Sequence, residues 1–156
     1  MKNKKLYIAY GSNINLEQMA RRCPTTDVVA TGMLQNYRLQ FNGVATIEPE
    51  KDAQTPVLIW TINPSDEKSL DVYEGYPSFY RKEMFELDIE GEQYEGMAYI
   101  MNGGLEHTPS QTYYNCILDG YTANGLDTSF LEEALERANE ATIDEEPEEN
   151  EQMTFE

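Results

Sequence analysis

Apolar residues in the first half of the chain recur in short runs that are typical of strands. Residues 5–10 form one run of strand-forming residues. Residues 27–41 alternate enough to form one or two strands with a bend near Gly32, and residues 44–47 and 56–62 predict two further strands. We therefore expect this half of the chain to supply several strands of one sheet.

Two short helices are predicted between and after these strands. Residues 15–22 have helical spacing, and Asn13 or Asn15 can cap their first turn. Asn63 has the properties of a second cap, because a proline at the first helical position and two acidic residues in the first turn follow it. The helix that begins there must end at Gly75, since glycine commonly follows the last helical residue.

The pattern of the second half predicts a hairpin followed by two helices. Every second residue from 85 to 89 is apolar, and Gly91 then turns the chain into a strand over residues 93–101. Helical patterns cover residues 108–125 and 127–140. This order of elements favours the α+β class, with a small, mixed and mostly antiparallel, barrel-like sheet and flanking helices.

Negative charge is concentrated towards the C-terminus. The chain has 156 residues, with 11 Lys+Arg against 29 Asp+Glu and a formal net charge of −18. Residues 140–156 contain eight acidic residues and no basic residue. Because like charges repel and few apolar residues there offset the cost of ordering, we expect residues 143–156 to be an acidic, mobile tail. Residues 1–142 then form a single domain, which suits their length.

The composition excludes several classes of function. A strongly acidic chain repels phosphate backbones, so nucleic acid is not expected as a ligand. No apolar run approaches the roughly 18 residues of a membrane helix, and the stretch after the N-terminal lysines is too short for an export signal. We therefore expect a cytoplasmic protein with no membrane partner. Two cysteines and one histidine are too few, and too far apart, for a Cys/His zinc cluster. The glycine-rich motifs that bind nucleotide cofactors are also missing.

The first segment with candidate chemistry is the tetrapeptide Tyr10-Gly11-Ser12-Asn13, which joins the end of a strand to the start of a helix. Successive main-chain N–H groups of Gly11, Ser12 and Asn13 can point into one concavity, with a helix N-terminus behind them. Such an arrangement is a physical site for an anion or an oxyanion. The alternative is an ordinary strand–helix turn with an asparagine cap.

The second candidate for a chemical role is Glu74. It follows Leu70 by four residues and therefore shares the face that this leucine buries, in the last helical turn before Gly75. Desolvation and the helix dipole both act to raise the pKa of a carboxyl group in that position, towards the range useful for proton transfer. The alternative is a glutamate that reaches water at a frayed helix end.

Five segments, in order and at compatible spacing over about residues 6–135, resemble the γ-glutamylcyclotransferase family, the AIG2-like group. They are YIAYGSNINLEQMARRCP from residue 7, GMLQNYRLQF with VATI, WTIN with SLDVYEGYPSFYR, YIM from residue 99, and PSQTY with the later GY and GLD. One departure is the strand from Pro56, which lacks the glycine usually found before the tryptophan and bears on the shape of the pocket.

The resemblance implies a γ-glutamylcyclotransferase-like enzyme on a small α+β barrel-like fold. It implies release of 5-oxoproline and a free amine or amino acid from a γ-glutamyl amide or peptide by internal attack, without metal or cofactor. Glu74 falls on the position of the catalytic acid/base. The implied substrate-binding residues are Tyr7, Tyr10, Gly11, Ser12, Asn13, Tyr80 and Tyr113.

Other functions stay open from the sequence. The same scaffold could act on a different γ-glutamyl conjugate in biosynthesis. It could also be a non-catalytic module that binds a carboxylate or peptide, or an interaction protein that works through its acidic tail. The expected partner is a small γ-glutamyl substrate, and the oligomeric state, a homodimer included, is not determined by these patterns.

Overall fold

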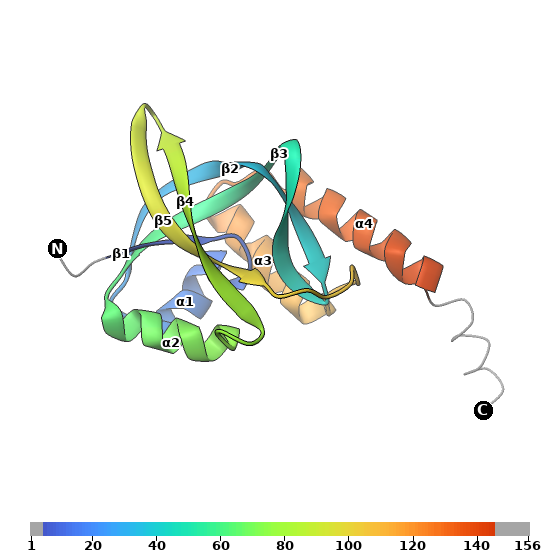
Figure 1. The fold of residues 1–156 in the computed structure, drawn as a ribbon, viewed down its shortest axis with the longest axis horizontal. Coiled ribbons are helices and arrows are strands. Elements are labelled where there is room, and N and C mark those ends of the chain that lie inside the picture. The colour runs from blue at the N-terminus through green and yellow to red at the C-terminus, as the bar shows by residue number, and fades with distance from the viewer. Residues whose placement is uncertain (1–4, 146–156) are drawn as a thin grey trace.

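The computed structural model of the protein describes residues 5–145 (Figure 1). In chain order the elements are β1 (Lys5–Ala9), the short 3-10 helix η1 (Ser12–Ile14), α1 (Leu16–Arg22), β2 (Asp27–Asn42), β3 (Val44–Ile62), α2 (Pro64–Glu74), β4 (Tyr80–Ile89), β5 (Glu92–Met101), α3 (Gln111–Ala123) and α4 (Ser129–Glu145). Within this part of the chain no helix is long and apolar enough to span a membrane.

The strands form one five-stranded sheet in the order β2-β3-β1-β5-β4. β1 pairs antiparallel with β3 and parallel with β5, and the β2–β3 and β4–β5 hairpins are antiparallel. The sheet curls until its two edge strands touch: the rings of Tyr37 and Phe85 are 5.1 Å apart between centroids, and a Cβ atom on Gly32 would lie 3.1 Å from Ile89. The predicted mixed, mostly antiparallel α+β fold is confirmed, with a strongly curved open sheet instead of a closed barrel.

One detail of the strand prediction is wrong. Residues 44–62 form the single strand β3, because the polar segment between the two predicted strands pairs with the polar stretch of β2 around Arg38. The prediction of one or two strands over residues 27–41 is met by the single strand β2, whose register shifts lie on either side of Gly32, at residues 28–30 and 35–37. The alternation of apolar and polar residues along the sequence does not reveal such pairing, because strand pairs that are exposed to solvent contain few apolar residues.

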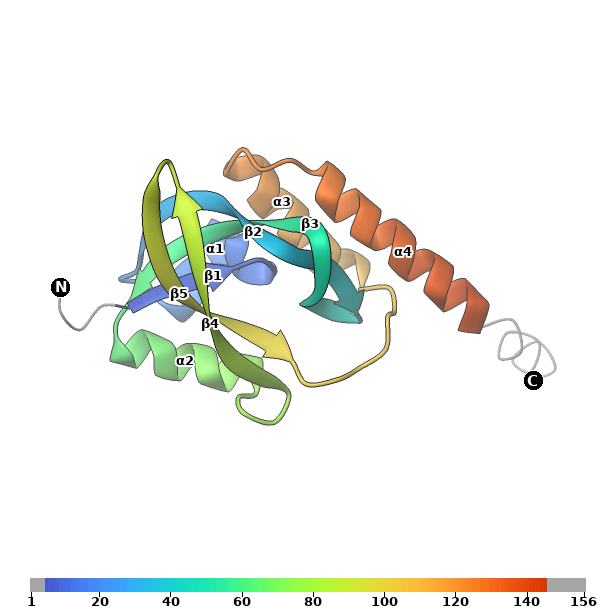
Figure 2. The same ribbon diagram turned by 45° about the horizontal axis from the view of Figure 1, so that its top comes forward.

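The helices lie on different sides of the curved sheet (Figures 1 and 2). α3 and α4 run along the β2–β3 ribbon, whereas α2 lies beneath β4 and β5. α4 continues past the predicted helix end at residue 140, because the buried Thr142 accepts a hydrogen bond from the Thr108 main-chain N–H (3.1 Å). Helix α4 thus includes residues 143–145 of the predicted tail, and the remainder, residues 146–156, lies outside the described part of the chain.

Helix α2 begins and ends as its local signals predict. Asn63 and Asp66 form a reciprocal capping box, Pro64 occupies the first helical position, and Gly75 takes the left-handed conformation (φ 66°) at the other end. Leu70 is the one fully buried apolar side chain of this helix. Apolar packing alone therefore gives α2 little to hold it on the sheet.

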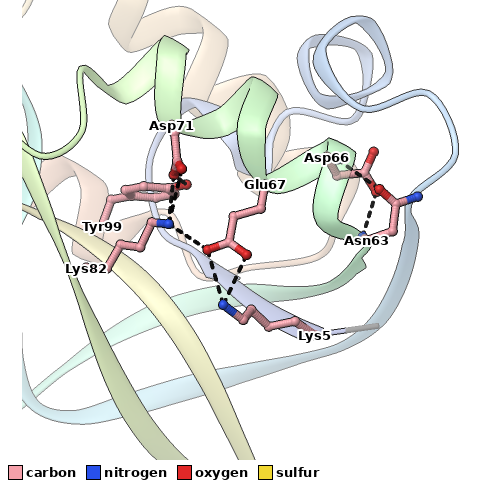
Figure 3. Close-up of polar contacts among 7 residues, drawn as sticks. All are labelled: Lys5, Asn63, Asp66, Glu67, Asp71, Lys82 and Tyr99. Carbon is pink, nitrogen blue, oxygen red and sulfur yellow. Dashed lines mark hydrogen bonds and ion pairs between the residues drawn. The ribbon is translucent and has the colours of Figure 1, made fainter. Parts of the chain in front are cut away.

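Polar contacts supply the rest of the attachment of α2 (Figure 3). Glu67 pairs with Lys5 (3.0 Å) and with Lys82 (2.6 Å), while Asp71 pairs with Lys82 (3.0 Å) and accepts a hydrogen bond from the Tyr99 hydroxyl (2.6 Å). Burial alone would raise the pKa of Glu67, but its hydrogen bonds with the two lysines outweigh burial and lower it. These contacts come from β1, β4 and β5, so they hold the middle of the helix, from Glu67 to Asp71, against three strands.

A close approach between α3 and the start of α1 positions the loop after β1. At Gly120 an added Cβ atom would lie 2.8 Å from the Asn15 nitrogen and 2.9 Å from the Ile14 carbonyl carbon. Two side-chain amides reinforce this contact: Asn15 donates to the Cys116 carbonyl (2.9 Å) and Asn124 donates to the Ile14 carbonyl (3.1 Å). Because the nearest atoms belong to the backbone, a larger residue at 120 cannot be accommodated by a side-chain rotation.

We expect Gly120→Ala to lower the melting temperature by several degrees. Overpacking against backbone costs about 1–3 kcal/mol, and about 1 kcal/mol shifts the midpoint of a domain this size by roughly 2–4 °C. Thermal unfolding followed by circular dichroism measures the effect. Asp119→Ala, at the exposed preceding position, is the matched control and should change the midpoint little. Equal midpoints for Gly120→Ala and wild type would contradict the close approach.

Candidate active site

One cavity of about 170 Å³ collects the residues that the sequence singled out. Strand β1 and η1 form one wall, the first residues of β3 and Tyr113 of α3 form another, and the end of α2 with Tyr80 of β4 closes the third. All eight predicted site residues line it: Tyr7, Tyr10, Gly11, Ser12, Asn13, Glu74, Tyr80 and Tyr113. The other lining residues are Ile8, Val44, Ala45, Tyr73, Phe79 and Tyr99.

Gly11 lets the loop after β1 pass close to β3. A Cβ atom at this position would lie 3.2 Å from the Ala45 Cβ and 3.5 Å from the Tyr113 hydroxyl, so a side chain there would intrude on the cavity wall. The main-chain N–H groups of Ser12 and Asn13 stand at the start of η1, where a helix offers them no internal acceptor. The loop can therefore present these donors to a bound acceptor.

Asn13 belongs to the cavity and does not cap the following helix. The cap of α1 is Asn15, whose side chain accepts from the Gln18 N–H. The Asn13 amide instead donates to the Tyr7 hydroxyl (2.9 Å) and accepts from Arg22 (3.0 Å). Only 2% of the Asn13 surface is exposed. Its side chain is held by residues of β1 and α1, whereas an ordinary strand–helix turn would need no such contacts.

Six of the fourteen residues that line the cavity are tyrosines, and the hydroxyl groups of three of them form hydrogen bonds with the main chain. Tyr80 donates to the Ala45 carbonyl (2.6 Å), and Tyr113 accepts from the Ala45 N–H (3.0 Å). Tyr10 donates to the Tyr99 carbonyl. Burial first, and the Glu74 carboxylate in addition, raise the pKa of each of the phenols Tyr7, Tyr10, Tyr80 and Tyr113. The phenols are therefore neutral donors and acceptors at ordinary pH.

Glu74 is the one acidic side chain that lines the cavity, and it is half-buried at the last residue of α2. The glycine cap that follows closes this helix end, so the end is not frayed. Within residues 5–145 the carboxyl group has no hydrogen bond or ion pair. Desolvation raises its pKa to about 7, and the charge of Arg22 partly opposes that rise. Such a group exchanges a proton near neutral pH.

Two further residues contribute contacts at the site, and helical periodicity leaves no signal for either contact. The Tyr73 hydroxyl forms a hydrogen bond with Ser12 Oγ (2.9 Å). The Arg22 guanidinium lies 3.4 Å from the centroid of the Tyr73 ring. His107 does not line the cavity. Within residues 5–145, no group of His, Cys, Asp and Glu could hold a metal ion.

A family model described as γ-glutamyl cyclotransferase, AIG2-like, matches residues 7–117. The chain belongs to this family. Curated relatives named γ-glutamylcyclotransferase include the human protein, 29% identical over 141 residues that cover 81% of this chain and 75% of the relative. The bovine protein of the same name is 30% identical over 135 residues, covering 78% of this chain and 72% of the relative.

Several solved structures share the fold of this chain. A structure of γ-glutamyl cyclotransferase superposes with a TM-score of 0.77 at 26% identity, covering 84% of this chain and 86% of that one. A human crystal structure gives 0.78 at 27% identity, covering 85% and 86%. YkqA from Bacillus subtilis, at 22% identity and a TM-score of 0.74, shares the fold over 90% of this chain and 56% of its own.

The electrostatics of this family member predict a pH-dependent stability change in Glu74→Gln. Because the folded-state pKa of about 7 exceeds the ordinary 4.5, the protonated carboxyl favours the folded state below about pH 4.5. That contribution is lost as pH rises through about 7, whereas glutamine is neutral throughout. The variant should therefore melt a few degrees above wild type at pH 8, with the gap largely closed at pH 4.

Scanning calorimetry at the two pH values measures this difference. Glu95→Gln is the matched control, because it removes one negative charge from an exposed position on β5. The control corrects for the general relief of repulsion in a chain of net charge −18. A Glu74→Gln midpoint at pH 8 that does not exceed that of Glu95→Gln would contradict the desolvated carboxyl.

Proposed function

We propose that the protein cyclises a γ-glutamyl amide or peptide, releasing 5-oxoproline and a free amine or amino acid. The observation that carries the proposal is the Glu74 carboxyl, which has no hydrogen bond or ion pair within residues 5–145 and lines the same cavity as the Gly11–Asn13 loop. Membership of the family and the name γ-glutamylcyclotransferase of the human and bovine relatives support the same reaction.

In the proposed reaction the nucleophile belongs to the substrate. Its α-amine attacks its own γ-carbonyl carbon, a C–N bond closes the five-membered lactam, and the C–N bond to the leaving amine breaks. The reaction is already intramolecular, and well-oriented internal attack reaches effective molarities of about 10⁵–10⁸ M. The protein therefore needs to hold the glutamyl chain folded back, remove a proton and stabilise charge.

Glu74 is the proposed acid/base. The α-amine is mostly an ammonium ion at neutral pH and cannot attack until it loses a proton. A carboxyl with a pKa of about 7 is sufficiently basic to take that proton when ionised and sufficiently acidic to return one to the leaving nitrogen. The neutral tyrosines around it do not compete for the proton, since the pKa of each is raised.

The loop Gly11–Asn13 is the proposed anion cradle. Its main-chain N–H groups are suited to hold either the developing γ-oxyanion or the α-carboxylate of the substrate. The cavity of about 170 Å³ is smaller than the roughly 300–1,000 Å³ of drug-sized sites, which suits a glutamyl group alone. The leaving group would then stay near the exposed rings of Tyr73 and Phe79.

Glu74→Gln should fold and lose turnover by at least about 10²-fold, the usual contribution of a positioned acid/base. Release of 5-oxoproline from a panel of γ-glutamyl amides and dipeptides, wild type beside variant, measures this loss. Glutamine keeps the shape of the side chain, so packing is conserved. A near-normal rate would remove Glu74 from the mechanism. Calorimetric binding of γ-glutamyl dipeptides by wild type without any product would instead favour a non-catalytic binding module.

Blocking the α-amine of the substrate should abolish the reaction, because the acetylated nitrogen cannot close the lactam. The measurement compares a γ-glutamyl dipeptide with its N-acetyl derivative and follows both the free amino acid and 5-oxoproline. Binding of the N-acetyl compound, measured as competition against the free dipeptide, shows whether it reaches the site. Release of the amino acid from a bound N-acetyl substrate would show hydrolysis by water and contradict cyclisation.

A further inference from the structure

Arg22, in the last turn of α1, joins two parts of the cavity wall that come from distant parts of the chain. Its Nη1 donates to the Asn13 side-chain oxygen (3.0 Å), and its guanidinium lies over the Tyr73 ring at 3.4 Å from the centroid. Asn13 belongs to the cradle loop, and Tyr73 directly precedes Glu74 at the end of α2. Arg22 itself does not line the cavity, so it acts on substrate only through these neighbours.

The contact with Asn13 orients an amide that has two different ends. Because the guanidinium is a donor only, it selects the oxygen of Asn13, which leaves the amide nitrogen to donate to the Tyr7 hydroxyl (2.9 Å). The main-chain oxygen of Asn13 accepts from the Trp60 indole (3.1 Å). A side chain without this donor would leave the amide free to rotate and the cradle less ordered.

The contact with Tyr73 ties the same guanidinium to the helix that carries the acid/base. A planar cation stacked on an aromatic ring is attracted by the ring electrons, and the stack also fixes the ring plane. The Tyr73 hydroxyl in turn forms a hydrogen bond with Ser12 Oγ (2.9 Å). The cradle, α1 and the end of α2 are therefore linked in a closed ring of contacts through Arg22.

The titratable and charged groups near Glu74 come from several elements. Tyr7 of β1, Tyr10 directly after β1, Tyr80 of β4 and Tyr113 of α3 are neutral phenols, because the pKa of each is raised. Arg22 of α1 is the charged group whose electrostatic effect on the Glu74 carboxyl is favourable to its ionised form. Lys82 is already paired with Glu67 and Asp71.

We propose that Arg22 is a positioning residue for the cyclotransferase reaction: it clamps the cradle loop to the end of α2 and supplies the positive charge that faces the Glu74 carboxylate. The proposal rests on the proposed function for its catalytic meaning. Its physical content, one guanidinium that contacts both Asn13 and Tyr73 and favours the ionised form of the neighbouring Glu74, stands independently of the substrate.

The decisive measurement titrates Glu74 directly by carbon NMR of protein labelled at the glutamate carboxyl carbons. The resonance is assigned by its absence in Glu74→Gln. Removing the charge in Arg22→Gln should move the midpoint upward by at least about half a pH unit. This is less than the roughly one to three units of a charge in direct contact, because Arg22 forms no ion pair with Glu74 within residues 5–145. Arg21→Gln, at the exposed preceding position of the same helix, is the matched control and should leave the midpoint unchanged.

Measurements of activity then test whether the pKa of Glu74 affects the reaction rate. On the acid limb of kcat/KM, a half-unit rise lowers the rate of Arg22→Gln about threefold below that of Arg22→Lys, and this difference should vanish above pH 9, where Glu74 is ionised in both variants. Arg22→Lys keeps the charge but has no planar face, so its midpoint should match wild type while kcat/KM falls about tenfold. Arg22→Met, whose unbranched side chain can still pack on the Tyr73 ring, is the neutral variant to use if Arg22→Gln does not fold.

The measurements test the electrostatic role of Arg22, its clamping role and the proposed function separately. Unchanged Glu74 midpoints in Arg22→Gln and Arg22→Met would overturn the electrostatic role, and wild-type kcat/KM in Arg22→Lys would overturn the clamp. If wild type releases no 5-oxoproline from any γ-glutamyl compound, the proposed function fails, but the NMR midpoints still decide whether Arg22 controls Glu74.

Discussion

The structure depends on keeping one carboxyl group half-buried with no hydrogen bond or ion pair from the described residues 5–145. Glu74 ends α2 against a cavity wall of neutral phenols, where desolvation raises its pKa to about 7. An ionised group in such a position destabilises the fold, so the surrounding contacts must hold the helix end in place. That requirement explains why α2, with a single fully buried apolar side chain, carries so many polar attachments.

The carboxylates on this face of α2 have opposite environments. Glu67 and Asp71 are neutralised by lysines from β1 and β4, and the Tyr99 hydroxyl adds a hydrogen bond to Asp71. Glu74, one turn further along, faces the cavity instead. Side chains four and three residues apart share a helix face, so the paired carboxylates fix the orientation of the unpaired one. Glu67 and Asp71 therefore attach the helix to the sheet, whereas Glu74 lines the cavity.

Tyr99 connects this attachment to the cavity. Its hydroxyl binds Asp71, its carbonyl accepts from the Tyr10 hydroxyl, and its ring packs edge-on against Tyr7 at 5.9 Å between centroids. Arg22 makes a comparable connection on the other side, between the cradle loop and the end of α2. The chain shares its family with relatives named γ-glutamylcyclotransferase, and these two connections describe how its own residues build the cavity.

The sequence by itself determined the elements whose signals are local. The capped helices, the β4–β5 hairpin, the turn at residues 10–13 and the placement of Glu74 at a helix end follow from residues within a few positions of one another. Only the tertiary structure decided the continuous β3 strand and the contacts of Asn13 and Arg22. These depend on contacts between separate elements, such as Arg22 with Tyr73, for which neither periodicity nor capping leaves a signal in the chain.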